Sequence, residues 1–193
     1  MRDLKSIELL VDLLADRVGG LVSYASLAEE LQVSPHTVKK WIGILESLFV
    51  VFVVKPYSKR IERSLLKQPK IYFFDTGRVK NEAGARFENT VACALYKHTH
   101  FREDTFGERR ALCFLRDKQK REVDFLTTVE NEIEWLVEAE VSDSEPSPAL
   151  GHFQRMLALK ASVQLVRSLR RPTEKEGVKV VEAARWLQLL EAL

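Results

Sequence analysis

The sequence has few of the residues and segments that mark disulfide-bonded, zinc-binding or membrane-spanning proteins. Its 2 cysteines, Cys93 and Cys113, lie in separate segments without CxxC spacing, so neither a disulfide framework nor a zinc site is predicted. The apolar run LFVVFVV at residues 48–54 is far shorter than the roughly 18 residues of a membrane span. The N-terminal MRDLKSIELLVDLL has acids within its apolar pattern and no cleavage-site chemistry, unlike a signal peptide. We therefore expect a cytoplasmic protein without membrane contact.

The sequence also lacks a recognisable nucleotide-binding motif. No stretch of the sequence matches GxxxxGK[ST], the glycine-rich loop whose backbone amides hold nucleotide phosphates. No internal repeat or low-complexity tract is found either. A chain of 193 residues that is 46% hydrophobic and 30% charged fits a globular protein with one large domain or two small ones. We expect no nucleotide binding by this chain.

Charge of each sign is segregated along the chain, although the formal net charge is only +2. The segment 55–70 carries six basic residues and one acid, Glu62, whereas the segment 129–145 carries seven acids and no base. The simplest interpretation of either block is a solvated face. A basic block followed by an acidic block, each on its own structural unit, favours a functional role for both.

The first part of the chain has the pattern of a winged helix-turn-helix domain, for which we predict the bounds 1–78. Apolar residues at helical spacing predict a helix over 3–18 and a short helix within 23–31. A second helix is expected to begin after Ser34, the N-cap, with Pro35 at its first position. Two short helices joined by a tight turn are typical of a helix-turn-helix. The paired strands that would complete the wing are expected at 49–54 and 70–75.

A domain of this kind predicts DNA as a partner. The outward positions of the second helix would face the major groove, and the basic loop between the strands would contact phosphates, which makes affinity depend on salt. The helix offers few side chains for bidentate base recognition, so weak sequence preference is expected. Winged helices also serve as protein-docking modules, and this alternative stays open. The candidate DNA-binding residues are His36, Thr37, Lys39, Lys40, Lys55, Lys59, Arg60, Arg63 and Lys67.

The second part, residues 79–193, predicts an α/β domain with a mixed central sheet. Its expected order is a helix, three strands, a helix and a strand, followed by a polar loop at 170–179 and a closing helix at 181–193. The expected helices lie at 81–100 and 149–160, and the expected strands at 111–117, 121–128, 134–142 and 162–168.

Acidic residues on the predicted strands are candidate catalytic residues. Alternate residues of a strand share a face, so Glu122 pairs with Asp124 and Glu138 with Glu140. Neighbouring strands could bring Asp124 and Glu138 around one Mg²⁺ or Mn²⁺ ion, because hard cations take carboxylate oxygens. Glu88, on the preceding helix, would add a third carboxylate. A metal in this place would activate water for hydrolysis of a phosphodiester. An exposed acidic sheet face is the alternative.

The order of elements and these acids resemble the PD-(D/E)XK nuclease fold, whose signature is an acid on one strand and acid-x-lysine on the next. Asp124 matches the first acid, Glu138 the second and Glu88 the helix acid, while Glu140 stands where the lysine belongs. Over nearly the whole chain the sequence is similar to the C-terminal region of prokaryotic AAA-type ATPases. In that family a winged helix is followed by a nuclease-like domain of unknown function. The stretches that carry this resemblance are KIYFFDTG, FEN and REVDF.

The acid at position 140 predicts that the nuclease-like domain no longer cuts DNA. Losing one electrostatic donor from such a site typically costs about 10²–10³ in rate, and an acid adds repulsion against an anionic substrate. A basic residue that has moved elsewhere would restore the charge, and Lys120, Arg121, Arg155 and Lys160 are candidates. The resulting expectation is a DNA-binding and docking module with a degenerate, non-cleaving nuclease-like domain. A metal-dependent DNA endonuclease and a protein-interaction scaffold are the alternatives, with an ATPase module or a second copy as further possible partners.

Overall fold

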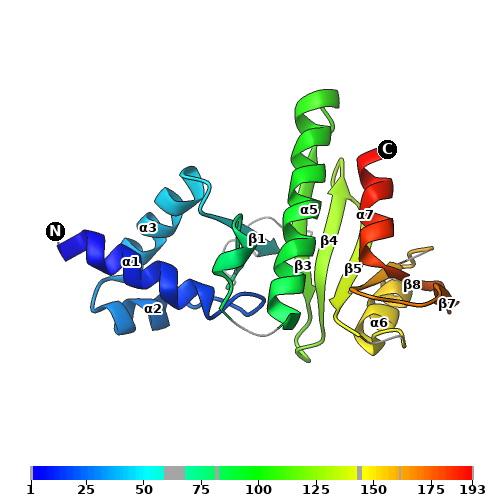
Figure 1. The fold of residues 1–193 in the computed structure, drawn as a ribbon, viewed down its shortest axis with the longest axis horizontal. Coiled ribbons are helices and arrows are strands. Elements are labelled where there is room, and N and C mark those ends of the chain that lie inside the picture. Colours follow the sequence, from blue (N-terminus) through cyan, green and yellow to red (C-terminus); the bar gives the residue numbers. More distant parts are fainter. Residues whose placement is uncertain (1, 59–67, 81–82, 143–144, 161, 193) are drawn as a thin grey trace.

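The computed structural model describes residues 2–58, 68–80, 83–142, 145–160 and 162–192. Its helices are α1 (Arg2–Ala15), α2 (Tyr24–Leu31), α3 (Pro35–Ser47), the 3-10 helix η1 (Thr76–Arg78), α5 (Ala83–Phe106), α6 (Pro148–Met156) and α7 (Ala183–Ala192). Its strands are β1 (Val51–Pro56), β2 (Lys70–Phe73), β3 (Arg110–Arg116), β4 (Glu122–Val129), β5 (Glu132–Glu140), β6 (Ser162–Val166), β7 (Thr173–Lys175) and β8 (Val178–Glu182). Helices α1–α3 form the N-terminal lobe at the left of Figure 1.

The N-terminal helices begin where local capping chemistry requires. The Ser23 hydroxyl accepts the Ser26 N–H at the start of α2, and the Ser34 hydroxyl accepts the Thr37 N–H at the start of α3. Each bond satisfies one of the amides that a first helical turn leaves without a partner. Pro35 occupies the first turn of α3, where its missing N–H costs nothing. The predicted start of this helix is therefore confirmed.

One mixed sheet passes through the whole chain. Its eight strands lie in the order β2-β1-β3-β4-β5-β6-β8-β7. The β1–β2, β3–β4, β4–β5 and β7–β8 pairs are antiparallel, whereas β1–β3, β5–β6 and β6–β8 are parallel. The pairing of β1 with β3, at Lys55–Cys113 and Pro56–Phe114, joins the N-terminal hairpin to the rest of the sheet. The predicted mixed α/β class is confirmed, and the division at residue 78 stays a prediction.

The prediction of a polar loop over 170–179 is wrong, because this segment contains β7 and the start of β8. A two-residue turn of Glu176 and Gly177 connects the two strands, and both residues have positive φ, 52° and 81°. Such a turn matches the natural twist of antiparallel strands. All three residues of β7 are exposed, so the strand has no apolar alternation by which a sequence pattern could reveal it.

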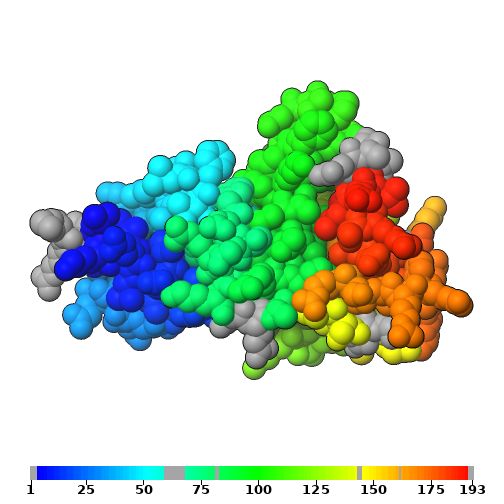
Figure 2. Space-filling view, viewed as in Figure 1, coloured from blue at the N-terminus to red at the C-terminus, as the bar shows by residue number. Residues whose placement is uncertain are grey.

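Helices cover the two faces of the sheet with separate cores. Helices α5 and α7 lie over one face (Figure 1), where Phe125 and Val137 belong to the large core. Helix α6 contributes Leu150 and Phe153 to a smaller core with Leu136. No helix in the described ranges is long and apolar enough to cross a membrane. The C-terminal part of α5 stands out from the body of the molecule (Figure 2).

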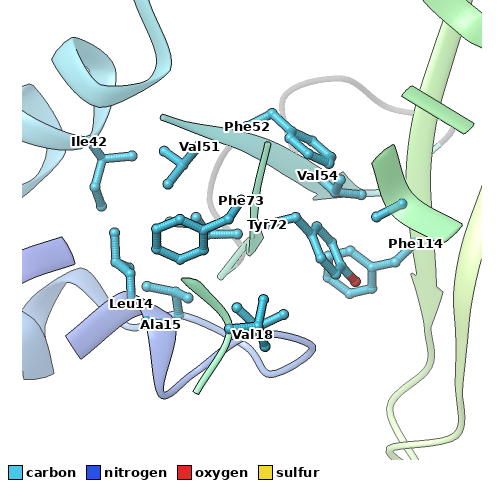
Figure 3. Packing of buried hydrophobic residues seen from close by; sticks show 14 of the residues in the cluster. Leu14, Ala15, Val18, Ile42, Val51, Phe52, Val54, Tyr72, Phe73 and Phe114 are labelled. Carbon is cyan, nitrogen blue, oxygen red and sulfur yellow. The ribbon is translucent and has the colours of Figure 1, made fainter. Parts of the chain in front are cut away.

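The β1–β2 hairpin is buried on both sides, which fixes its position. Figure 3 shows Phe73 directed towards Leu14 and Ala15 of the helical lobe, while Tyr72 lies beside Phe114 of β3. Phe52, Tyr72 and Phe73 have no exposed surface. Burying aromatic rings of this size contributes much of the local packing energy. Side chains on β2 are therefore held firmly between the lobe and the rest of the sheet.

Candidate functional site

A buried lysine lies at the centre of a cluster of carboxylates. Lys70, the first residue of β2, is 1% exposed. Its Nζ lies 3.1 Å from an oxygen of Glu88, 2.9 Å from Glu122 and 3.2 Å from Asp124. An ammonium group has three N–H donors and no acceptor, so the three carboxylates match its full donor capacity. We call Lys70, Glu88, Glu122, Asp124 and Glu138 the acid–lysine cluster.

Four elements, β2, α5, β4 and β5, bring the residues of the cluster together. Lys70 and Tyr72 are alternate residues of β2 and therefore share a face. The Tyr72 hydroxyl donates a 2.6 Å hydrogen bond to Glu88 of α5. Glu122 and Asp124, alternate residues of β4, both reach the same Nζ. The ring of Phe114 closes the cluster on another side, with its centroid 5.8 Å from Nζ.

The side chain of Asn89, the residue after Glu88, holds helix α5 against β2. The side chain of Asn89 accepts the Phe73 N–H and donates to the Phe73 carbonyl, both at 2.8 Å. These bonds satisfy the backbone of an edge strand that would otherwise present unpaired groups. Because Asn89 is next to Glu88, the same contact positions the Glu88 carboxylate over Lys70.

Asp124 and Glu138 lie together, as the spacing on the two strands predicted. The Asp124 N–H donates to Glu138 Oε2 at 3.4 Å, and the Ala139 N–H donates to Asp124 Oδ2 at 3.1 Å. Asp124 thus uses one oxygen for Lys70 and the other for the β5 backbone. Glu140, at the end of β5, is exposed, and its charge acts on Glu138.

Burial and mutual repulsion change the protonation of these acids. Burial, together with the charge of Asp124, raises the pKa of Glu138 to about 9. Burial and Asp124 also raise the pKa of Glu88 to about 7, although Lys70 and the Tyr72 hydroxyl act in the opposite direction. Crowded carboxylates thus add to the effect of burial on each other's pKa. Burial lowers the pKa of Lys70, but the surrounding carboxylates outweigh it and leave the pKa above its ordinary value.

The acid–lysine cluster, as arranged, does not fit a divalent metal ion. Mg²⁺ requires oxygens at about 2.0–2.1 Å in near-octahedral geometry, whereas the carboxylates meet at an ammonium 2.9–3.2 Å away. Asp124 and Glu138 direct oxygens at backbone amides instead. Among the residues that the structure describes, no group of three or more His, Cys, Asp or Glu side chains could hold a metal.

A basic residue from elsewhere in the chain does lie beside the carboxylates, namely Lys70. The cation is none of the four candidates chosen by position in the chain. Arg121 pairs with Asp117 at 2.6 Å, and Arg155 pairs with Glu176 at 3.0 Å. Lys120 and Lys160 make no ion pair among those found in the described ranges. The sequence analysis did not identify Lys70 or Tyr72 as site residues. A signal was nevertheless present, because Lys70 is the first residue of the apolar strand KIYFF, where side chains are normally buried.

Helix α3 presents the residues predicted to contact DNA. His36, Lys39 and Lys40 are exposed, and their i, i+3 and i+4 spacing places them on neighbouring positions of one face. Thr37 is only half-buried, and its hydroxyl lies 2.9 Å from the Ser34 hydroxyl within the N-cap. Lys55 on β1 is exposed as well. The other predicted contacts lie outside the described residues, namely Lys59, Arg60, Arg63 and Lys67.

Comparison with known proteins gives a family match over the first part of the chain. The family model for a domain of unknown function (DUF8612) matches residues 1–86. This match covers α1–α3, the β1–β2 hairpin and η1, and it ends in the first turn of α5. No curated protein and no solved structure matches the chain.

Proposed function

We propose that this chain is a DNA-binding and docking module in which a winged helix is joined to a PD-(D/E)XK-like domain that does not cleave DNA. The observation that carries its non-cleaving part is that the Lys70 ammonium, which would otherwise restore the missing positive charge, is buried and already bonded to Glu88, Glu122 and Asp124. The proposal includes membership of the AAA-type ATPase family through its C-terminal region.

The arrangement of the first 80 residues supports the winged-helix part. Three helices are followed by the antiparallel β1–β2 pair, which is the order of a helix-turn-helix with a wing. In this assignment α3 is the recognition helix and the loop between β1 and β2 belongs to the wing. Lys39 and Lys40 would contact phosphates and give affinity without much sequence preference.

Gly43 gives independent support to contact through α3. A glycine within a helix costs about 1 kcal/mol relative to alanine, so its presence needs a reason. A Cβ added at Gly43 would meet nothing within 4 Å, and the residue is exposed, so packing within the chain does not require it. Because Gly43 has no side chain, a DNA backbone could approach the helix closely at this position, one turn beyond Lys39 and Lys40.

The chemistry of the acid–lysine cluster supports the absence of cleavage. Hydrolysis needs a polarised phosphate and an activated water, but the ammonium that could stabilise charge is 1% exposed. Its donors already meet carboxylates, so a substrate phosphate would have to displace them. Glu140, in the position of the family's lysine, is an exposed acid that would repel the same phosphate.

Exposed apolar residues on the terminal helices support a docking role. Leu4 and Leu9 of α1 are 65% and 48% exposed, and Leu189 of α7 is 62% exposed. Such positions fit contact with an ATPase module or a second copy of the chain.

Titration of a fluorescent DNA duplex by anisotropy tests DNA binding. We expect affinity to fall steeply between about 50 and 200 mM salt, because bound lysines release counterions from DNA. The variant Lys39→Ala/Lys40→Ala should reduce the salt slope by about 2, roughly one for each phosphate contact. The control Lys175→Ala/Lys179→Ala removes the same charge from exposed positions on β7 and β8 and should leave the slope unchanged.

Two results would contradict this function. Equal losses in the two double variants, or no binding at low salt, would favour the scaffold alternative. Incubation of supercoiled plasmid with Mg²⁺ or Mn²⁺ should leave it intact. Nicking that disappears in Asp124→Ala would instead identify the chain as a metal-dependent endonuclease.

A further inference from the structure

The hydrogen-bonding capacity of Lys70 is fully used inside the chain. Glu88, Glu122 and Asp124 approach its Nζ from α5 and β4, at 2.9–3.2 Å. An ion pair buried to this degree is costly to break, because removing one partner leaves an uncompensated charge in a medium that solvates it poorly. Lys70 is therefore a fixed part of the cluster.

A divalent ion and the Lys70 ammonium cannot occupy this point together. Mg²⁺ or Mn²⁺ would draw carboxylate oxygens to about 2.0–2.2 Å, into space now filled by Nζ. The ammonium would also repel the ion at short distance within a partly buried site. The carboxylates that converge on Nζ are, however, hard oxygen ligands of the kind that such an ion prefers. A site for a divalent ion would thus be formed if the ammonium were absent.

We infer that Lys70 acts as the built-in cation of this chain, taking the place of a divalent metal and fastening the β1–β2 hairpin to α5 and β4. While β2 stays in place, the acid–lysine cluster binds no divalent metal. Withdrawal of the Lys70 side chain opens a metal site formed by Asp124 with Glu122, Glu88 and Glu138. This inference rests on the non-cleaving part of the proposed function and is independent of DNA binding.

The contacts that hold β2 in place also hold Lys70 at the point where a metal ion would otherwise bind. Asn89 bonds both backbone groups of Phe73, and Tyr72 donates to Glu88, so α5 holds the strand that carries Lys70. The opposite edge of β2 pairs with β1 from Val51–Phe73 to Val54–Lys70. The backbone of Lys70 pairs with Val54 on one edge and forms a bridge with Leu21 on the other, and its side chain is 1% exposed, so both the strand and the side chain are fixed within the cluster.

Binding of Mn²⁺ alone, followed by calorimetry and by thermal unfolding, tests this inference. The unaltered protein should show no saturable binding and a melting temperature that Mn²⁺ does not raise. The variant Lys70→Ala/Glu88→Gln removes one positive and one negative charge and keeps Glu122, Asp124 and Glu138. It should bind Mn²⁺, with a rise in melting temperature of roughly 5–10 °C at about 100 times the Kd.

The matched control is Lys70→Ala/Asp124→Asn, which has the same net charge but lacks the central carboxylate. It should lose most of the Mn²⁺-dependent rise. Single Lys70→Ala should also gain Mn²⁺ binding, and if it folds only with Mn²⁺ present the inference is supported equally. Saturable Mn²⁺ binding by the unaltered protein, or a folded Lys70→Ala/Glu88→Gln variant that gains none, would overturn it. Neither readout uses DNA, so a failure of the DNA-binding proposal would be seen separately.

Discussion

At the scale of single residues, a buried lysine and its acids depend on each other. Lys70 keeps its charge because the carboxylates around it outweigh the cost of burial, and Glu88 and Asp124 tolerate burial because Lys70 is present. Arg116, 2.5 Å from Glu122, adds a second positive charge at the edge. The cluster still contains more acids than bases. Burial, together with the charge of Asp124, raises the pKa of Glu138 to about 9, so this acid is protonated at neutral pH.

The substitution Lys70→Met tests this dependence through stability. Methionine is also unbranched, although one atom shorter, and carries no charge, so Glu88, Glu122 and Asp124 lose their shared partner. We expect unfolding free energy to fall by about 3–5 kcal/mol, as for other buried pairs that lose one member. Urea denaturation measures this, and Lys70→Met/Glu88→Gln should recover part of the loss. A loss below about 1 kcal/mol would show that Lys70 is not the partner of these acids.

The raised pKa of Glu138 predicts how stability depends on pH. The carboxyl group titrates near its ordinary pKa of 4.5 when unfolded and at about 9 when folded, so the folded protein binds the extra proton between these values. Stability should therefore decrease as pH rises from about 5 to 9. Glu138→Gln carries no titrating group and should show a shallower decrease between pH 6 and pH 9. Parallel pH curves for the two proteins would contradict the assignment.

At the scale of elements, the contacts among β2, α5 and β4 explain three sequence motifs. KIYFFDTG supplies Lys70 and Tyr72, FEN supplies Glu88 and Asn89, and REVDF supplies Glu122 and Asp124. The residues of each motif contact those of another in the acid–lysine cluster or in the Asn89–Phe73 bonds.

Asn89→Ala should loosen this contact. The Phe73 N–H and carbonyl would lose their bonds in a buried place, where each unsatisfied group costs about 1–3 kcal/mol. We expect a loss of at least about 2 kcal/mol in urea denaturation and faster hydrogen exchange of the Phe73 amide. Thr90→Ala, which alters the exposed neighbour on α5, should change stability by less than about 0.5 kcal/mol. Equal effects of the two substitutions would contradict the role of Asn89.

Gly43→Ala separates stability from DNA contact on α3. Alanine should stabilise the helix by about 0.5–1 kcal/mol, because open space surrounds the new methyl group. Anisotropy should nevertheless show weaker DNA binding, because the methyl group stands on the proposed contact face. Gly151→Ala on α6 is the control, since its new Cβ would lie at an ordinary 3.5 Å from Arg155 and should leave DNA affinity unchanged. Unchanged DNA affinity in Gly43→Ala would argue against contact at this position.

Sequence patterns predicted those elements whose signals are local. Ser34 and Pro35 marked the start of α3 correctly, because capping depends on neighbouring residues. The turn after β2 is also built by neighbouring residues, because the Asp75 side chain accepts the Gly77 N–H at 2.9 Å. The β7–β8 hairpin was not predicted, because β7 is polar and exposed. In addition, Glu176-Gly177 is a weaker signal for a hairpin turn than Asn-Gly.

At the scale of the whole molecule, long-range contacts determine which charges meet. Lys70 and Asp124 are 54 residues apart in sequence, and β1 and β3 lie between their strands in the sheet order, so this ion pair joins two strands that do not pair with each other. Periodicity within each segment indicated that neighbouring strands could bring Asp124 and Glu138 close together. It could not predict Lys70 as their neighbour, because that contact depends on the parallel pairing of β1 with β3, which no local pattern specifies.

Diffraction at the manganese absorption edge from crystals grown with Mn²⁺ tests the central claim most directly. The account predicts no anomalous peak among Glu88, Glu122, Asp124 and Glu138, with Lys70 Nζ remaining within hydrogen-bonding distance of its three carboxylates. An ordered Mn²⁺ ion bound by Asp124 and Glu138, with the Lys70 side chain displaced, would contradict it.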